Sequence, residues 1–124
     1  MRLISIFFLF LLISPSHGDE LCNEFRHLEK QWNSKLPEII DEHTELVQII
    51  VNCETRVVSY RKRILVTKDV LPSGIHDRKQ RQHTQLHCNK NGLASKSGWT
   101  AMDVIVDINF SYLFTLKTTP NDCK

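Results

Sequence analysis

Two histidines are spaced so that they could share a ligand. His83 and His87 lie four residues apart in a segment with a weak helical pattern, and His76 precedes them by one to two turns. Histidines at this spacing on one helix face can bind a common metal ion. The segment lacks a glutamate after His83, however, and so lacks the general base of zinc peptidases. With no third ligand evident, we expect a solvated polar helix face without metal. A metal site or hydrolase centred on His83 and His87 is the alternative.

Motifs of the common catalytic classes are missing from the sequence. There is no Gly-x-Ser-x-Gly elbow, no glycine-rich phosphate loop and no His-Glu-x-x-His segment. Asp103 and Asp107 lie on a predicted strand and the turn after it, so they need not converge as a glycosidase pair does. We therefore expect a protein that is not an enzyme and that uses no cofactor.

Residues 1 to 18 have the three parts of a cleavable secretory signal. Arg2 gives a positive start, Leu3 to Ile13 is apolar but for one serine, and Ser16 and Gly18 are small residues before a cut at Asp19. The apolar run is shorter than the roughly 20 residues that span a bilayer. We expect cleavage after Gly18 and one mature domain, residues 19 to 124, in the periplasm or secreted.

Basic and acidic residues are distributed unevenly along the mature chain. Residues 19 to 54 contain three basic and nine acidic residues, whereas residues 55 to 98 contain ten basic and two acidic ones. Six of these cations form two clusters, one on a predicted strand and one on a predicted helix: Arg61, Lys62 and Arg63, and Arg78, Lys79 and Arg81. We expect them to form one basic face. The residues predicted to bind a partner are Arg61, Arg63, Arg78, Lys79, Arg81 and, from a separate loop, Trp99.

A basic face on an exported protein indicates an anionic partner. Nucleic acid is not expected outside the cell, which leaves lipid headgroups, lipopolysaccharide or an acidic protein, with contact to a membrane surface. A charged helix that is simply solvated is the alternative. The loop Ser97-Gly98-Trp99 is somewhat like the protruding loop by which periplasmic lysozyme inhibitors plug a glycosidase cleft. Here the alternative is that Trp99 caps the core.

Hydrophobic periodicity predicts the elements that position these groups. Apolar residues from Leu21 to Leu36 recur at helical spacing, and Pro37 ends that helix. The next elements are a turn at residues 38–43, strands at 45–52 and 55–66, a helix from 75 to about 91, and a loop at 95–98. A hairpin of strands at 100–106 and 111–118 completes the chain. The prediction is a single α+β domain of order α-β-β-α-β-β, with an antiparallel sheet packed by two helices.

The mature chain has four cysteines, Cys22, Cys53, Cys88 and Cys123, and no close pair typical of a metal site. An even number in an exported chain favours two disulfides, with three pairings open. The first helix advances about 21 Å beyond Cys22, and the strand that ends at Cys53 returns about 26 Å. The last strand passes back across the sheet that the second helix covers. Reach therefore favours Cys22–Cys53 and Cys88–Cys123.

One set of positions spans nearly the whole mature chain. It comprises Leu36-Pro37, Ile40-Asp41, Thr44, Leu46, a strand bearing Tyr60, Cys88 on a helix, Gly98 before a hairpin, and Pro120-Asn121-Asp122-Cys123. In this pattern the chain resembles a group of small exported bacterial proteins, mostly of unknown function, one branch of which is labelled quorum-sensing-regulated virulence factor. Val104 and Val106 depart from it, because tyrosines are common there. The resemblance implies a fold and a compartment but no activity.

Together these features predict an exported, non-catalytic binding or accessory protein of the cell envelope, related to virulence. It would engage an anionic or protein partner through the basic face or through the Ser97-Gly98-Trp99 loop. A periplasmic inhibitor or immunity protein is the remaining alternative.

Overall fold

The computed structural model describes residues 16 to 124, and its first element is helix α2 (Ser16–Asn33). Leu21 and Phe25, on the predicted apolar stripe, pack against the core. The helix ends before Pro37, whose ring disfavours helical backbone in the preceding residue. Most of the predicted signal peptide lies outside the described residues. Helix α2 runs through the predicted cut after Gly18.

Five strands form one mixed sheet in the order β1-β2-β3-β4-β5. Their bounds are β1 (Glu38–Asp41), β2 (Thr44–Asn52), β3 (Val57–Ile64), β4 (Thr100–Val106) and β5 (Tyr112–Thr118). The segment predicted as a turn supplies β1, which pairs with the start of β2. The α+β class, the order of the main elements and the single domain are confirmed.

The sheet differs from the prediction in one pairing, because β3 and β4 are parallel while the other neighbours are antiparallel. Parallel neighbours need a crossover connection. Helix α3 (Ile75–His87) and the short helix α4 (Leu93–Lys96) provide it. Residues 93–96 thus include part of a segment that was predicted to be a loop.

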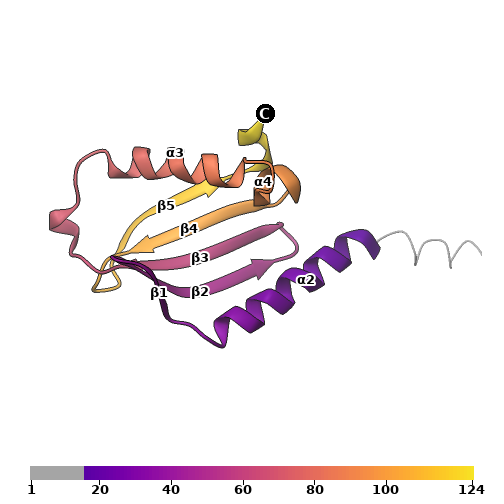
Figure 1. Ribbon diagram of the computed structural model, residues 1–124, viewed down its shortest axis with the longest axis horizontal. Coiled ribbons are helices and arrows are strands. Elements are labelled where there is room, and N and C mark those ends of the chain that lie inside the picture. Colours follow the sequence, from indigo (N-terminus) through magenta and orange to yellow (C-terminus); the bar gives the residue numbers. More distant parts are fainter. Residues whose placement is uncertain (1–15) are drawn as a thin grey trace, which may run out of the picture.

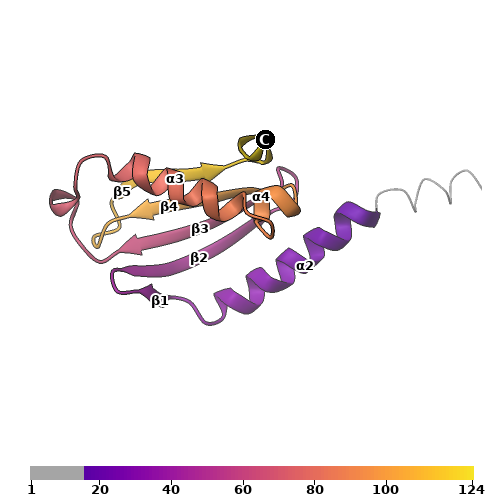
Figure 2. The same cartoon turned by 45° about the horizontal axis from the view of Figure 1, so that its top comes forward.

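Helices α2 and α3 lie on the same side of the sheet, α2 beside β2 and α3 over β4 and β5 (Figures 1 and 2). The strand register aligns Val51, Val58, Ala101 and Thr118 on this side, and all four are buried. Neither α2 nor α3 covers the opposite face, which carries Arg61 and Val104. The sheet therefore has a covered face and an open face.

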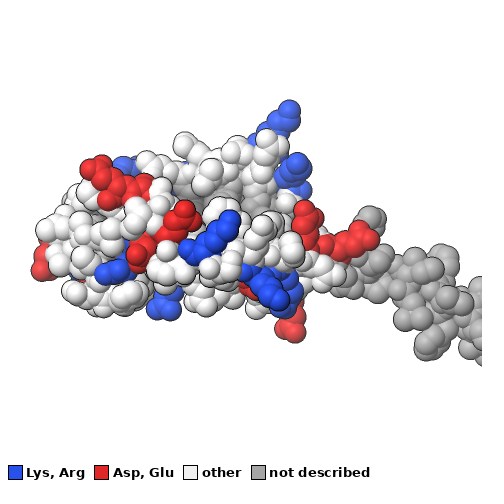
Figure 3. All heavy atoms as spheres, turned by 60° about the horizontal axis from the view of Figure 1, so that its bottom comes forward, with Lys and Arg blue, Asp and Glu red and all other residues white. Residues whose placement is uncertain are grey.

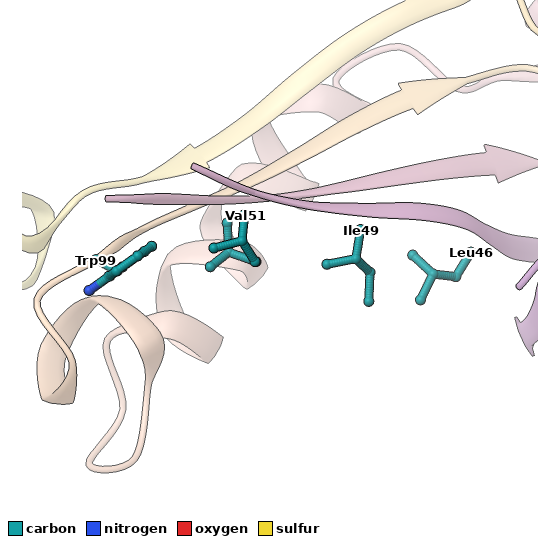
Figure 4. Close-up of a cluster of buried hydrophobic side chains, with 5 residues drawn as sticks. Leu46, Ile49, Val51 and Trp99 are labelled. Carbon is teal, nitrogen blue, oxygen red and sulfur yellow. The ribbon is translucent and has the colours of Figure 1, made fainter. Parts of the chain in front are cut away.

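The apolar core lies between α2 and the covered face. Leu46, Ile49 and Val51 of β2 point to one side of the sheet, toward the same layer as Trp99 (Figure 4). Phe25 of α2 meets Trp99 edge to face, with ring centroids 4.8 Å apart. This contact joins the first helix to the residue that precedes β4.

Each long helix also hydrogen-bonds to the outer edge of a strand. The Asn33 side chain donates to the carbonyl of Ile49 at 2.8 Å and accepts from its N–H at 2.9 Å. The Gln80 side chain of α3 bonds to both backbone groups of Lys117 in β5, at 2.9 and 3.0 Å. Unpaired backbone groups at a strand edge can pair with another chain. By occupying these groups, the two amides hinder such pairing.

Two disulfides, Cys22–Cys53 and Cys88–Cys123, confirm the predicted pairing, with Cα atoms 5.7 and 5.1 Å apart. The first joins α2 to the β2–β3 turn, and the second joins the end of α3 to the C-terminal segment. Such bridges indicate an oxidising, extracellular compartment. Within residues 16 to 124, no helix has the length and apolar character needed to cross a membrane.

Candidate binding surface

The three cations of β3 do not share a surface, because successive residues of a strand point to opposite faces. Lys62 lies on the covered face, and its Nζ is 2.7 Å from Oδ2 of Asp103. Arg63 lies on the open face, where Nη1 is 3.2 Å from Oε1 of Glu45 and Nε donates to the carbonyl of Ile108. Of the three side chains, only that of Arg61 is largely exposed to solvent.

The cations of α3 are in a different position. Arg78, Lys79 and Arg81 are all exposed, and none of the ion pairs formed within residues 16 to 124 involves them. The opposite side of the helix faces the sheet, where His76 and Gln80 bond to the backbone of β5. The outer side of α3 therefore points away from the sheet.

The predicted single basic face is consequently divided in two. Arg61 and Arg63 lie on the open face of the sheet, whereas the cations of α3 belong to the helix layer on the other side. Lys79 leans toward β1, where its charge helps to lower the pKa of Asp41, although the main cause is the hydrogen bond from the backbone of His43. The continuous outer surface of α3 is formed by Arg78, Arg81, Gln82, Gln85 and Leu86.

The acidic N-terminal segment does not form a face of one sign either. Figure 3 shows the side of the molecule that carries α2, and acidic and basic side chains are interspersed there with uncharged surface. Because Arg26, Lys30 and Lys35 lie among the acidic residues of this segment, its charge is locally mixed.

Trp99 does not protrude as the predicted partner-binding loop would require. Its side chain is only 4% exposed and belongs to the core cluster. Gly98 has φ of 71°, a left-handed conformation that glycine adopts without strain, and it turns the chain into β4. The alternative, that Trp99 caps the core, therefore agrees with its position.

The two histidines do not form a solvated helix face, and that prediction is wrong. His83 is 5% exposed, and its Nδ1 is 2.7 Å from the hydroxyl of Thr118. Its Nε2 faces Oδ1 of Asp103 at 3.5 Å. The ring of His87 lies 4.5 Å from that of His83. Burial and the neighbouring His83 lower the pKa of His87 from 6.5 to about 4, so it is neutral at physiological pH.

The buried carboxylate of Asp103 is the centre of this cluster. Burial alone would raise its pKa, but His83 and Lys62 outweigh that effect and hold the pKa below its usual value. Lys62 donates a hydrogen bond to Oδ2, and Nδ1 of His83 is hydrogen-bonded to Thr118, whereas Oδ1 of Asp103 and Nε2 of His83 are buried 3.5 Å apart without a hydrogen bond. Among the described residues, no group of three or more potential ligand side chains could hold a metal ion.

Comparison of the chain with protein-family models, with curated proteins and with solved structures found no match in any of the three. The resemblance to small exported bacterial proteins therefore stays a prediction. The function has to be inferred from the arrangement of residues alone.

Proposed function

We propose that this protein is an exported binding protein that engages the phosphate groups of an anionic envelope lipid through the outer surface of α3. One observation carries the proposal. The cations of α3 are exposed and free of ion pairs within residues 16 to 124, whereas Lys62 and Arg63 of β3 are neutralised internally. Helix α3 therefore presents three cations within four residues that are available to a partner.

The types of side chain on this surface favour phosphate. Guanidinium groups such as those of Arg78 and Arg81 bind phosphate oxygens with two parallel hydrogen bonds. The exposed amides of Gln82 and Gln85 are further donors on the same side of the helix. Leu86 is 59% exposed beside them, and an apolar side chain next to cations suits the boundary between headgroups and acyl chains.

The N-terminal sequence and the two disulfides support export of the protein. Cleavage after Gly18 would release the chain from Asp19 onward into the periplasm or the medium. Two disulfides, between cysteines 31 and 35 positions apart, are typical of an oxidising compartment. N-terminal sequencing of the exported protein should begin at Asp19, and a retained Arg2 would contradict release.

Binding to an anionic lipid can be tested by cosedimentation of the exported protein with vesicles. Vesicles containing phosphatidylglycerol should bind the protein and pure phosphatidylcholine vesicles should not, with binding that weakens as salt rises. Each cation near an anionic bilayer contributes about 1 kcal/mol, so Arg78→Gln/Arg81→Gln should weaken binding roughly 30-fold.

A matched control is offered by the open face of the sheet. Arg61→Gln/Lys117→Gln removes the same charge from two other exposed residues and should leave binding nearly unchanged. Equal losses in the two double variants would mean that only net charge matters. Binding to polyglutamate but not to vesicles would replace the lipid by an acidic protein.

A further inference from the structure

A second surface of the molecule is hollow and mostly apolar. A groove of about 280 Å³ lies between α2 and strands β2 and β3, on the covered face of the sheet. Its lining includes Phe25, Leu28 and Trp32 of α2 together with Leu46, Ile49 and Tyr60 of the strands. The same inward side chains of β2 are seen in Figure 4. Leu28 and Trp32 are 41% and 46% exposed, so the groove opens to solvent along the helix.

The groove contains one charged side chain. Glu29 of α2 lines it and accepts a hydrogen bond from the backbone N–H of Val51. A single hydrogen bond uses only part of the accepting capacity of a carboxylate, which has two oxygens. A carboxylate beside apolar side chains is costly unless a positive charge compensates it. The lining therefore disfavours an anion and leaves room for a cation.

The aromatic residues of the lining also favour a positively charged ligand. Three aromatic residues, Phe25, Trp32 and Tyr60, surround the groove, and aromatic rings attract ammonium groups. Burial, with a smaller effect of Asp103, raises the pKa of Tyr60, so its side chain stays an uncharged phenol. Lys62 lies 5.8 Å from the Tyr60 ring, but Asp103 neutralises it at 2.7 Å.

We propose that this groove binds a small hydrophobic amine, whose ammonium group pairs with Glu29 while its apolar body contacts the aromatic and aliphatic lining. This site is separate from the outer surface of α3 and does not depend on the function proposed above. If each non-hydrogen atom of a ligand occupies the volume of one water molecule in the liquid, the groove has room for roughly nine such atoms. An aromatic ring with a short aminoalkyl chain has that size.

The sign of the charge can be tested with three probes of nearly equal shape. Isothermal titration calorimetry would compare 2-phenylethylamine, 2-phenylethanol and phenylacetate, which are cationic, neutral and anionic at neutral pH. We expect the amine to bind at least tenfold more tightly than the alcohol and phenylacetate not to bind. Equal affinities for amine and alcohol, or no binding of any probe, would overturn the proposal.

Substitutions then assign the preference to named residues. Glu29→Gln keeps an oxygen for the Val51 N–H but removes the charge, so it should abolish the preference for the amine and preserve the affinity for the alcohol. Glu24→Gln changes an exposed residue of the same helix by the same charge and should have no effect. If Glu29→Gln does not fold, Trp32→Leu should weaken the amine more than the alcohol. Equal weakening would contradict a cation site.

Discussion

The chain contains two units of helix and sheet, α2 with β1 to β3 and α3 with β4 and β5, which attach their helices in the same way but have different linings. In the first, α2 bonds through Asn33 to β2, and Cys22–Cys53 links the helix to the turn between its strands. In the second, α3 bonds through Gln80 to β5, and Cys88–Cys123 links the helix to the segment after its strands. The same devices therefore fix both helices on one side of one sheet.

The two units differ in the residues that lie between the helix and the sheet. The first has an open apolar groove with Glu29 in its wall, whereas the second has the buried polar cluster of Asp103, His83 and Thr118. The outer surfaces differ as well, since α3 presents unpaired cations and charge is mixed along α2. Similar scaffolding thus carries surfaces that suit ligands of opposite charge.

Removing a disulfide should have the largest effect on stability, and a similar one in each unit. The paired cysteines are 31 and 35 positions apart in the sequence. In the chain-entropy model such closures stabilise by about 3 to 4 kcal/mol. Cys22→Ser/Cys53→Ser and Cys88→Ser/Cys123→Ser should each lower the free energy of unfolding by that amount in urea denaturation. If removing one disulfide lowered the free energy of unfolding by less than half as much as removing the other, the two disulfides would not stabilise their units equally.

The buried cluster should be more sensitive than the groove. Lys62→Met leaves the Asp103 carboxylate buried without its closest cation, which typically costs about 3 kcal/mol. Leu28→Met in the rim of the groove conserves volume and should cost less than about 1 kcal/mol. Thermal or urea denaturation of both variants makes the comparison. Equal losses would contradict the difference between a buried polar cluster and an open groove.

The second unit should also make stability depend on pH between about 4 and 6.5. The unfolded chain protonates His87 near pH 6.5, whereas burial delays protonation in the folded protein to about pH 4. Stability is therefore complete above pH 6.5 and falls as the pH is lowered, by about 2 kcal/mol after allowance for partial exposure. Asp103, whose pKa is lowered, adds a loss only below about pH 3.8. His87→Asn should flatten the profile above pH 4, and an unchanged profile would contradict burial of this ring.

The smallest expected effect comes from the two amides at the strand edges. Asn33→Ala and Gln80→Ala each remove two hydrogen bonds to strand backbone and should destabilise by about 1 kcal/mol. Hydrogen exchange at Ile49 and Lys117 would report the loss locally. If each variant increased exchange at the amide of the other unit, the two edges would not be independent.

Local pattern and reach predicted much of this fold. Helical spacing located α2, alternation and β-branched apolar runs located β2 to β5 but not β1, and distances along elements decided the disulfide pairing. The parallel pairing of β3 with β4 was missed, because it depends on the side to which α3 crosses and no local pattern encodes that choice. Strand alternation did contain the information that Lys62 is separated from Arg61 and Arg63. The prediction did leave Lys62 out of the partner-binding residues, but it placed Arg61 and Arg63 on the same face as the cations of α3.

The candidate sites were harder to predict than the fold. The sequence identified the cations of α3 but not which side of the helix would face the sheet. The groove remained hidden because its walls come from residues 25 to 60, which only packing brings together. Asp103 alternates with Ala101 and Ile105 in β4, a spacing that could have indicated a buried carboxylate.

The claim that the two units suit ligands of opposite charge can be tested in a single NMR measurement. The isotope-labelled exported protein would be titrated separately with 2-phenylethylamine and with short-chain phosphatidylglycerol below its micelle concentration. We predict that the amine shifts the amide signals of residues 25–32 and 46–51, while the phospholipid shifts those of residues 78–86. Shifts of one common set by both probes, or an unshifted α2 in the presence of the amine, would contradict the claim.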